Sequence, residues 1–593
     1  MSKSNNLDNL RHSTAHLLAA AVTSIWPDVL PTIGPSISDG FYYDFDFGKI
    51  NVSDKDLSKI EGKMKQIVKN WDKFTKEEVS ETKAKAQYKN NKYKKELIDD
   101  LVHEKENISL YKSGDFVDLC KGGHVANPSD EIKHFKLLSI AGAYWRGNEK
   151  NKMLTRIYGT VFPTKKELDD HLAMIEKAKD NDHRTLNRVL KLYQANDLLG
   201  QGLVTLLPNG TIIAKELEDW AQDTERKWGY QQVLSPQIAT ESLFKISGHV
   251  PYYLDSMYPP MHLEEKGKGE KEVYYLRPMN CAHHHLVYKD VPRSYRDLPL
   301  RISEYGTVYR YERSGEIHGM MRVRGPIHQN DAHIFCTEDQ AEEEFQKVME
   351  LHKYYYDLLG LSKKDYLLSF AIRDKNNKDK YLGDDALWEK AERIALKYIK
   401  STNIPYEIEE GGAAFYGPKI DFNIKTVTGK VFGASTNQLD FFLPKAFKLT
   451  YTDKDGDEKT PVCIHRAPLG AHVRFVAFLT EHFGGAFPVW LSPVQVKVLP
   501  ITSKNIDYSK QILETLLNED IRATIDDRNE TLQSKIRKAQ IEKVPYMLIV
   551  GDKEENSKNI AVRLRDGSNL GQLELGKFII NIKDKISEKS LEL

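Results

Sequence analysis

A cysteine and several histidines form one group of side chains that could do chemistry. Cys281 precedes three histidines at 283–285, and His333 and His465 lie in strand-like stretches. Thiolate and imidazole are ligands that zinc prefers, and three protein ligands leave one coordination position open to a substrate. The separations of 52 and 132 residues match no metal-binding motif. Spacing alone therefore favours a buried thiol among core histidines.

Arginine-rich segments form a second group. Four arginines surround a glycine-bearing loop within the fifteen residues 310–324. A planar guanidinium suits phosphate oxygens better than an ammonium does, so this loop could bind a polyphosphate. A surface hairpin with ion pairs is the structural alternative. Arg474 enters an apolar helix after Gly470, where it either faces a ligand or pairs with a carboxylate.

The N-terminal part of the chain holds a third group. His12 and His16 are four residues apart and therefore share one face of a helix. Cys120 and His124 form a CxxxH pattern. The four side chains could bind a metal or surround a water molecule that they activate. A lysine-rich run at 83–95 is typical of a solvated helix face.

Four segments must position these side chains. The first, to about residue 162, mixes strand-like and helix-like pieces. The next begins with Thr164 and Glu167 at capping-box spacing and predicts two helices that act as a stiff connector. Residues 198–490 lack regular βα alternation, which favours an antiparallel α+β core. Residues 491–593 alternate strands and helices, as a small α/β domain does, with predicted strands at 494–501, 522–525, 546–551 and 559–565 and predicted helices at 508–517, 531–543 and 576–586.

Composition excludes several classes of protein. The 593 residues carry 86 basic and 86 acidic side chains and are 40% apolar, which is ordinary globular composition. Zero net charge argues against indiscriminate nucleic-acid binding, although a local basic groove is compatible with it. The sequence has no apolar run long enough for a membrane helix and no secretory signal. Four widely spaced cysteines argue against a disulfide framework, so we expect a cytoplasmic location.

Taken together, these stretches resemble a known family. Residues 227–236, Arg310-x-Glu312 and Gly470…Arg474 resemble motifs 1, 2 and 3 of class II aminoacyl-tRNA synthetases, in that order. Further stretches narrow the resemblance to threonyl-tRNA synthetases, over nearly the whole chain; they lie at 277–281, 318–325, 331–338, 412–419 and 490–493. Residues 118–124 and 141–147 resemble the editing domain of that family, and 544–554 its anticodon-binding domain.

The resemblance implies a multidomain α+β protein. The expected parts are an editing domain (1–162), a helical linker (163–197), an antiparallel-sheet catalytic domain (198–490) and an α/β anticodon-binding domain (491–593). The implied activity joins L-threonine to tRNA(Thr) with ATP and Mg²⁺, and hydrolyses mischarged seryl-tRNA(Thr). The family also implies one zinc ion per subunit and a homodimer formed through the motif 1 region.

Residue roles follow from the same resemblance. The zinc ligands would be Cys281, His333 and His465. ATP would contact Arg310 at the α-phosphate, Glu312 on the adenine side, Arg322, and Arg474 at the adenine and γ-phosphate. Threonine would meet Asp331 through its ammonium, with Gln329, Tyr416, Gln438 and Lys419 around it. Editing would use His12, His16, Lys94, Cys120 and His124, and the anticodon would be read by Glu554 and Arg563.

Physical chemistry explains why such a protein would combine zinc with editing. An apolar pocket distinguishes threonine poorly from the isosteric valine, whereas a metal that binds the hydroxyl rejects valine. Serine keeps that hydroxyl and lacks only a methyl group, a difference of about 1–3 kcal/mol, so a second, hydrolytic site is required. The family pattern favours attack by water without a metal at that site.

The chain departs from the family pattern at several positions. His12 already belongs to the editing motif, so the ubiquitin-like domain that usually precedes it is absent from this sequence. Ala282-His283 replaces a Pro-Gly pair, Val473 replaces a glutamate, and the 325–331 loop is one residue longer. A non-catalytic RNA-binding protein or a free-standing deacylase are the rival interpretations. The first would have lost zinc or phosphate ligands, and the second needs no anticodon domain.

Overall fold

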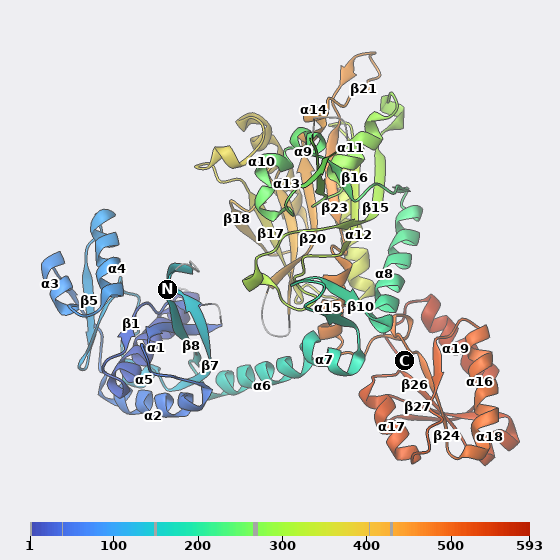
Figure 1. Cartoon of the computed structure of the whole chain (residues 1–593), viewed down its shortest axis with the longest axis horizontal. Helices are drawn as coiled ribbons and strands as arrows, with labels where there is room; N and C mark the ends of the chain where they lie inside the picture. Colours follow the sequence, from blue (N-terminus) through green and yellow to red (C-terminus); the bar gives the residue numbers. More distant parts are fainter. Residues whose placement is uncertain (1–2, 38, 148–150, 265–270, 403, 427–430) are drawn as a thin grey trace. The chain divides into compact units, whose positions relative to one another are not determined.

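The computed structural model describes residues 3–37, 39–147, 151–264, 271–402, 404–426 and 431–593. It contains two compact units, residues 1–176 and 177–593 (Figure 1). The finer domain boundaries given above stay predictions. Among the described helices, none combines the length and apolarity needed to cross a membrane.

The first unit is built on a long helix, α1 (Lys3–Ile25), whose apolar residues pack on an antiparallel sheet and on α2 (Leu57–Ile67). That sheet runs in the order β1 (Leu30–Pro31), β3 (Gly40–Asp46), β8 (Met153–Phe162), β7 (His134–Tyr144), with β2 (Ser36–Ile37) paired to β3. A second sheet comprises β4 (Thr75–Glu78), β5 (Ser109–Ser113) and β6 (Phe116–Leu119). The remaining helices are α3 (Glu81–Gln87), α4 (Lys92–His103) and α5 (Pro128–Glu131).

The two helices predicted for the connector are present as α6 (Lys165–Asn181) and α7 (His183–Leu190). Thr164 and Glu167 form the predicted capping box, because each main-chain N–H donates to the other side chain. The second helix ends at Leu190, whereas the apolar spacing of the sequence extends the predicted helix to Tyr193. Lys191 adopts a left-handed conformation (φ 52°), and Tyr193 already belongs to β9 (Tyr193–Ala195), which pairs with β10 (Val204–Leu206).

The second unit contains an eight-stranded sheet. Its order is β11 (Gln231–Gln232), β15 (Leu300–Val308), β16 (Ile327–Cys336), β23 (Val462–Ala467), β20 (Val431–Asp440), β19 (Lys419–Lys425), β17 (Tyr366–Ile372), β18 (Tyr406–Glu410). The central pairs are antiparallel and only the two edge pairs are parallel. The predicted antiparallel α+β core is therefore confirmed (Figure 1).

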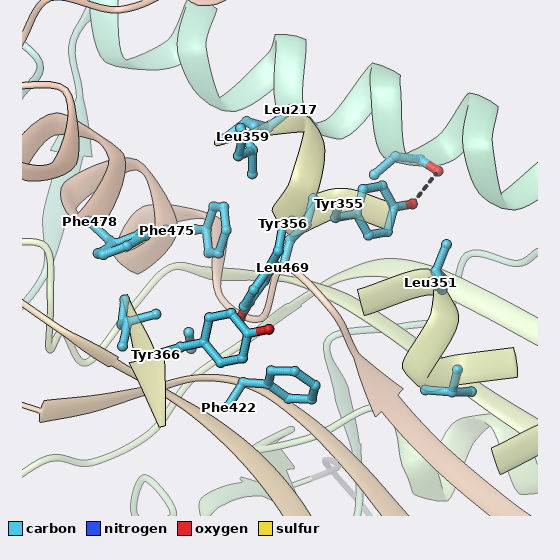
Figure 2. Packing of buried hydrophobic residues seen from close by; sticks show 14 of the residues in the cluster. Leu217, Leu351, Tyr355, Tyr356, Leu359, Tyr366, Phe422, Leu469, Phe475 and Phe478 are labelled. Atoms are coloured by element: carbon cyan, nitrogen blue, oxygen red, sulfur yellow. Dashed lines mark hydrogen bonds between the residues drawn. The ribbon is translucent and has the colours of Figure 1, made fainter. Parts of the chain in front are cut away.

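The two faces of this sheet differ in character. One face carries apolar residues such as Ile334, Ile464 and Phe422, which pack under α8 (Pro208–Lys227), α12 (Ala341–Leu358) and α15 (His472–His482). Figure 2 shows Tyr356 of α12 between Phe475 and Phe422 in this core, and Tyr355 donates a hydrogen bond to the carbonyl of Ala221. Because strand side chains alternate, the intervening residues face the opposite side.

Shorter elements surround that opposite face. They are β12 (Ile238–Thr240), β13 (Met261–Glu264), β14 (Lys271–Leu276), β21 (Tyr451–Thr452), β22 (Glu458–Lys459), α9 (Glu241–Ile246), α10 (His249–Tyr252), α11 (Cys281–Lys289), α13 (Asp385–Ser401) and α14 (Leu443–Ala446).

The C-terminal part contains a five-stranded sheet. Its order is β25 (Ala523–Ile525), β24 (Val496–Pro500), β26 (Tyr546–Val550), β27 (Asn559–Leu564), β28 (Asn569–Glu574), flanked by α16 (Ile506–Asn518), α17 (Leu532–Ile541), α18 (Asp552–Ser557) and α19 (Leu575–Ser587). The predicted α/β fold is confirmed, and α18 and β28 are additions to the predicted elements.

Candidate active sites

Sheet register brings the central site of the second unit together. His333 pairs with His465, His465 with Gln438, and Gln438 with Lys419, so one row crosses four strands. Directly paired residues point to the same face of a sheet. Asp331 and Gln329 precede His333 by two and four residues on β16 and therefore share that face. The row and these two residues line a cavity of about 460 Å³.

A metal-ligand group lies at the wall of this cavity. Cys281, the first residue of α11, and the two histidines His333 and His465 are all buried, and their ligand atoms lie within 4.8 Å of one another. Burial raises the pKa of the Cys281 thiol and lowers the pKa of His333 well below its usual range, so the imidazole is neutral as a ligand must be. Two nitrogen donors and one sulfur donor form a set that suits zinc.

Neighbouring residues fix which nitrogen of each histidine is available. Nε2 of His465 lies 2.9 Å from Asp440 Oδ2, which leaves Nδ1 free to bind a metal. His284 lies 3.0 Å from Glu304 through Nε2 and 2.8 Å from His333 Nδ1 through its own Nδ1. Because Glu304 accepts from His284 Nε2, the Nδ1 of His284 carries no proton and accepts from His333 Nδ1. The other nitrogen of His333, Nε2, is therefore left as its ligand atom. Such carboxylate–histidine contacts orient metal ligands.

Arg310 and Arg474 both line the same cavity. Arg474, near the start of α15, donates to the main-chain carbonyls of Met321 (2.7 Å) and Gly433 (2.8 Å). Burial and the nearby Arg310 charge lower the pKa of Arg474 to about 10, which leaves it cationic at neutral pH. Two neighbouring cations in one cavity are the arrangement that an anionic ligand stabilises.

Glu312 lines the cavity, whereas Arg322 does not. Arg322 instead forms an ion pair with Glu312 (2.8 Å) and with Glu316 (3.1 Å). Arg322 therefore contacts Glu312 from outside the cavity. Of these two residues, Glu312 is the one that can contact a ligand in the cavity.

The remaining predicted pocket residues form a hydrogen-bond chain. The Tyr416 hydroxyl donates to Gln438 Oε1 (2.6 Å), Gln438 donates to Thr436, and Thr436 donates to Asp421, which also pairs with Lys419. The Tyr416 ring stacks on His465 with centroids 4.6 Å apart. Asp331 accepts from Asn280 (3.0 Å), and burial raises its pKa.

The first unit holds the second cluster. Cys120 Sγ lies 3.0 Å from His12 Nε2 and 3.3 Å from His124 Nε2, and His12 lies 3.4 Å from His16. Helix α1 supplies both His12 and His16, and Cys120 directly follows β6. All four ligand atoms lie within 4.8 Å of one another, so the predicted juxtaposition is present.

Asp118 organises the charges of this cluster. It accepts from Tyr43 (2.6 Å) and pairs with His16 (3.0 Å) and Lys94 (2.5 Å). Burial would raise the pKa of Asp118, but Lys94 and His16 bring it well below its usual range. Burial would likewise lower the pKa of His16, but Asp118 and Cys120 raise it to about 9. Hydrogen bonds from the three histidines lower the pKa of Cys120 to about 3 despite burial.

Lys94 departs from the solvated face expected of the lysine-rich run. It is only 2% exposed, whereas Lys83, Lys89 and Lys92 of the same run are exposed as predicted. Asn91 caps α4 by accepting the main-chain N–H groups of Tyr93 and Lys94, and the Lys94 ammonium contacts Asp118 and the Tyr43 hydroxyl (3.2 Å).

The two residues predicted to read an anticodon lie in the C-terminal sheet domain. Glu554 is 8% exposed and binds within the fold: in the first turn of α18 it accepts from the N–H of the N-cap residue Gly551 (3.0 Å), and it also accepts from Gln572 (2.7 Å). Arg563 lies on β27, opposite Met547 and Asn569. Contacts of either residue with RNA stay predictions.

Sequence reasoning missed the supporting carboxylates. Asp440 and Asp421 each follow a predicted pocket residue, Gln438 and Lys419, by two positions, and the two-residue strand period was the signal that could have found them. Glu304 and Tyr43 carry no local signal, because only the paired strands bring them to their sites.

Comparison with known proteins identifies the class. Residues 263–483 match the tRNA synthetase class II core domain (G, H, P, S and T), residues 495–585 an anticodon binding domain, and residues 108–158 the second additional domain of threonyl and alanyl tRNA synthetases. The sheet and cavity described above therefore belong to a class II aminoacyl-tRNA synthetase core.

Whole-chain relatives narrow this to one family. Threonine–tRNA ligases of Staphylococcus carnosus (strain TM300) and Staphylococcus aureus (strain JH9) are 47% and 46% identical over 584 residues, covering 98% of this chain and 89% of each relative. A crystal structure of the RNA binding domain of threonyl-tRNA synthetase from Cryptosporidium parvum aligns with 68% of this chain and 98% of its own, with a TM-score of 0.63 and 34% identity. The chain belongs to the threonine–tRNA ligase family.

Proposed function

We propose that the cavity of the second unit activates L-threonine with ATP and transfers it to tRNA(Thr). The observation that carries this proposal is the row across the sheet, which places a metal-ligand group and Asp331 in the same cavity as Arg310 and Arg474. A carboxylate there suits the N–H donors of an amino group, and two arginines suit a polyphosphate.

We propose that Cys281, His333 and His465 hold one zinc ion per subunit, since their burial, donor types and oriented nitrogens fit that metal. When bound, the ion would supply coordination positions for the neutral amino group and the hydroxyl group of threonine. Asp331 accepts a hydrogen bond from the threonine amino group, and Gln329, Tyr416 and Gln438 enclose the side chain, with Lys419 nearby. A valine side chain cannot replace the hydroxyl as a ligand and is rejected.

The arginines act on the nucleotide in this proposal. Arg310 binds the α-phosphate, where negative charge increases as the threonine carboxylate attacks. Arg474 packs on the adenine and reaches the γ-phosphate, and Glu312 contacts the adenine side. Arg322 acts indirectly, because its ion pair holds Glu312 in place. Mg²⁺ enters with ATP as part of the substrate.

Threonine-dependent exchange of pyrophosphate into ATP, with zinc quantified on the same sample, tests this proposal. We expect exchange in proportion to zinc content and at least tenfold less with valine at equal concentration. Folded, zinc-loaded protein that catalyses no exchange would contradict it.

We further propose that the cluster of the first unit hydrolyses seryl-tRNA(Thr). Serine offers the same ligands as threonine, so the synthetic site accepts it. The anionic Cys120 is already balanced by the protonated His16, which supports attack by water without a metal. His12 and His124 orient the water in this scheme, and Lys94, fixed by Asp118, donates to the ester oxygen as charge develops there.

Three further parts of the proposal concern partners and location. The motif 1 region would form a homodimer, in which Leu234, 91% exposed in the single chain, would be covered. Glu554 and Arg563 would contribute to anticodon recognition, Glu554 by shaping the α18 turn. We propose that the protein acts in the cytoplasm.

A further inference from the structure

His183, the first residue of α7, is completely buried. Its Nδ1 lies 2.7 Å from Glu481 Oε1 of α15, and the same carboxylate oxygen accepts the His183 main-chain N–H (3.3 Å). On the other side of the ring, Nε2 accepts the main-chain N–H of Met320 (3.2 Å). These partners place the imidazole proton on Nδ1. The ring therefore bridges α15 and the loop of the arginine-rich motif.

The Met320–Met321 segment leads directly to Arg474. The Met321 carbonyl accepts from Arg474 Nε at 2.7 Å. Arg474 and Glu481 both belong to α15 and are seven residues apart, so they lie on one face of that helix. A closed circuit results, from His183 to Glu481, along α15 to Arg474, and back through Met321 and Met320.

Glycine at position 319 allows the close approach of loop and ring. Gly319 has φ +53°, and a Cβ at this residue would lie 2.2 Å from His183 Nε2. Both the backbone conformation and the available space therefore disfavour any other residue there. The loop lies against the imidazole itself.

Asp182, His183 and Glu481 also satisfy the distance criterion for a metal site. Their hydrogen bonds argue for a different role. Both His183 nitrogens already have partners, and Asp182 binds the Arg184 guanidinium through two contacts of 2.9 and 2.7 Å. The group is thus a hydrogen-bond network that joins the connector helix to the two arginine-bearing motifs.

We infer that His183 is a positioning residue for the nucleotide site: through its Nε2 it holds the Met320–Met321 segment, and that segment holds the Arg474 guanidinium in the cavity. The inference rests on the proposed function, in which Arg474 binds ATP. It gives the connector a part in ATP binding that its sequence does not suggest.

Two substitutions test the two contacts of the His183 ring separately, the one with Glu481 and the one with Met320. An asparagine amide takes the place of Nδ1 and still donates to Glu481, but it does not reach Met320. A glutamine amide reaches the place of Nε2 and still accepts from Met320. ATP affinity is measured directly by calorimetry with the intact protein, alongside the KM for ATP and for threonine in pyrophosphate exchange.

We expect H183N to weaken ATP binding about tenfold or more, as for loss of a buried hydrogen bond, with the KM for threonine and the zinc content changed less than about twofold. H183Q should recover at least about half of the lost ATP affinity, compared as the logarithm of the Kd for ATP. Equal ATP affinity in the two variants, or weaker binding by H183Q, would overturn the inference, because the contact with Glu481 would then be the one that matters.

A substitution on the loop gives an independent test if H183N proves unstable in thermal melts. G319A should reproduce the weaker ATP binding because it displaces the same contact, and in the H183N background it should add little. Fully additive effects would contradict the circuit. Wild-type protein that binds no ATP would contradict the proposed function itself, whereas wild-type binding with unchanged H183N affinity would contradict only the role of His183.

Discussion

His333 on β16 and His465 on β23 are directly paired across two antiparallel strands, with ring centroids 4.4 Å apart, although 132 residues separate them in the chain. The pairing explains how ligands without motif spacing become neighbours. Cys281 completes the group from the first turn of α11. The zinc proposal therefore depends on strand register more than on any local sequence.

Replacing the sulfur ligand should remove the metal. We expect Cys281→Ser to lower the zinc content well below one ion per chain and to abolish threonine activation, while ATP binding persists. Metal analysis and calorimetry with ATP check this. Cys336→Ser, at a buried cysteine in the neighbouring core, is the matched control and should retain zinc. Retention of zinc by the Cys281 variant would show that the histidines at 283–285 replace the thiolate.

The carboxylate behind His465 should tune metal affinity. Asp440→Asn keeps the size of the side chain but weakens its hold on Nε2 of His465. We expect zinc affinity to fall about 10–100-fold, as for other carboxylates that orient a ligand histidine. Competition with a chelator measures the change. An unchanged affinity would mean that Tyr416, stacked on the same ring, suffices to orient it.

Lys94 should matter for deacylation although its neighbours in the run do not. Lys94→Met removes the ammonium from Asp118 and leaves that buried carboxylate with fewer partners. We expect hydrolysis of seryl-tRNA(Thr) to fall about 100-fold or more, with threonine activation unchanged. Lys89→Met changes an exposed lysine of the same run and is the control. Equal deacylation by both variants would contradict the assignment.

The cluster also predicts how the stability of the first unit depends on pH. Between pH 9 and about 3, unfolded Cys120 binds a proton that the folded thiolate does not, so its contribution falls as pH falls. Between about 6.5 and 9, folded His16 binds a proton that the unfolded residue does not, and its contribution falls as pH rises. The two effects oppose each other above pH 6.5. Below it the Cys120 effect acts in the same direction as that of His124, whose pKa is lowered by burial, and near pH 4 as that of Asp118.

We therefore expect protection of α1 amides against hydrogen exchange to be nearly constant from pH 6.5 to 9, after correction for intrinsic rates, and to decrease from pH 6.5 towards 4. Cys120→Ser should abolish most of the decrease. A wild-type decrease that survives this substitution would assign the acid sensitivity to other groups.

Elements set by local periodicity could be predicted from the sequence, whereas contacts set by register could not. Amphipathic spacing placed α16 and α17 to within two residues. Strand β28 was missed because Gly571 has φ +79° and Leu570 is exposed, so its pattern of alternation is weak. Composition likewise predicts an exposed Lys94, and only the tertiary contact with Asp118 buries it.

The functional residues divide in the same way. Cys281, His333 and His465 could be chosen through a family resemblance, and Asp440 could be found from its two-residue offset from Gln438, but Glu304, which holds His284 against His333, could not. Glu304 is opposite Asp331 across a strand pair, and no local spacing connects the two. The position of Arg322 behind Glu312 is likewise a property of the folded loop.

The row of paired residues across β16, β23, β20 and β19 restricts where residues can be inserted into or deleted from the chain. A single residue gained or lost within β23 would turn His465 toward the helix-covered face and detach it from both neighbouring strands at once. The β21–β22 hairpin, which joins the same part of the chain at Thr452–Glu458, lies outside the row and can be lengthened or shortened without moving any of those residues. Codon insertions and deletions should therefore persist in the hairpin and be eliminated from the strands.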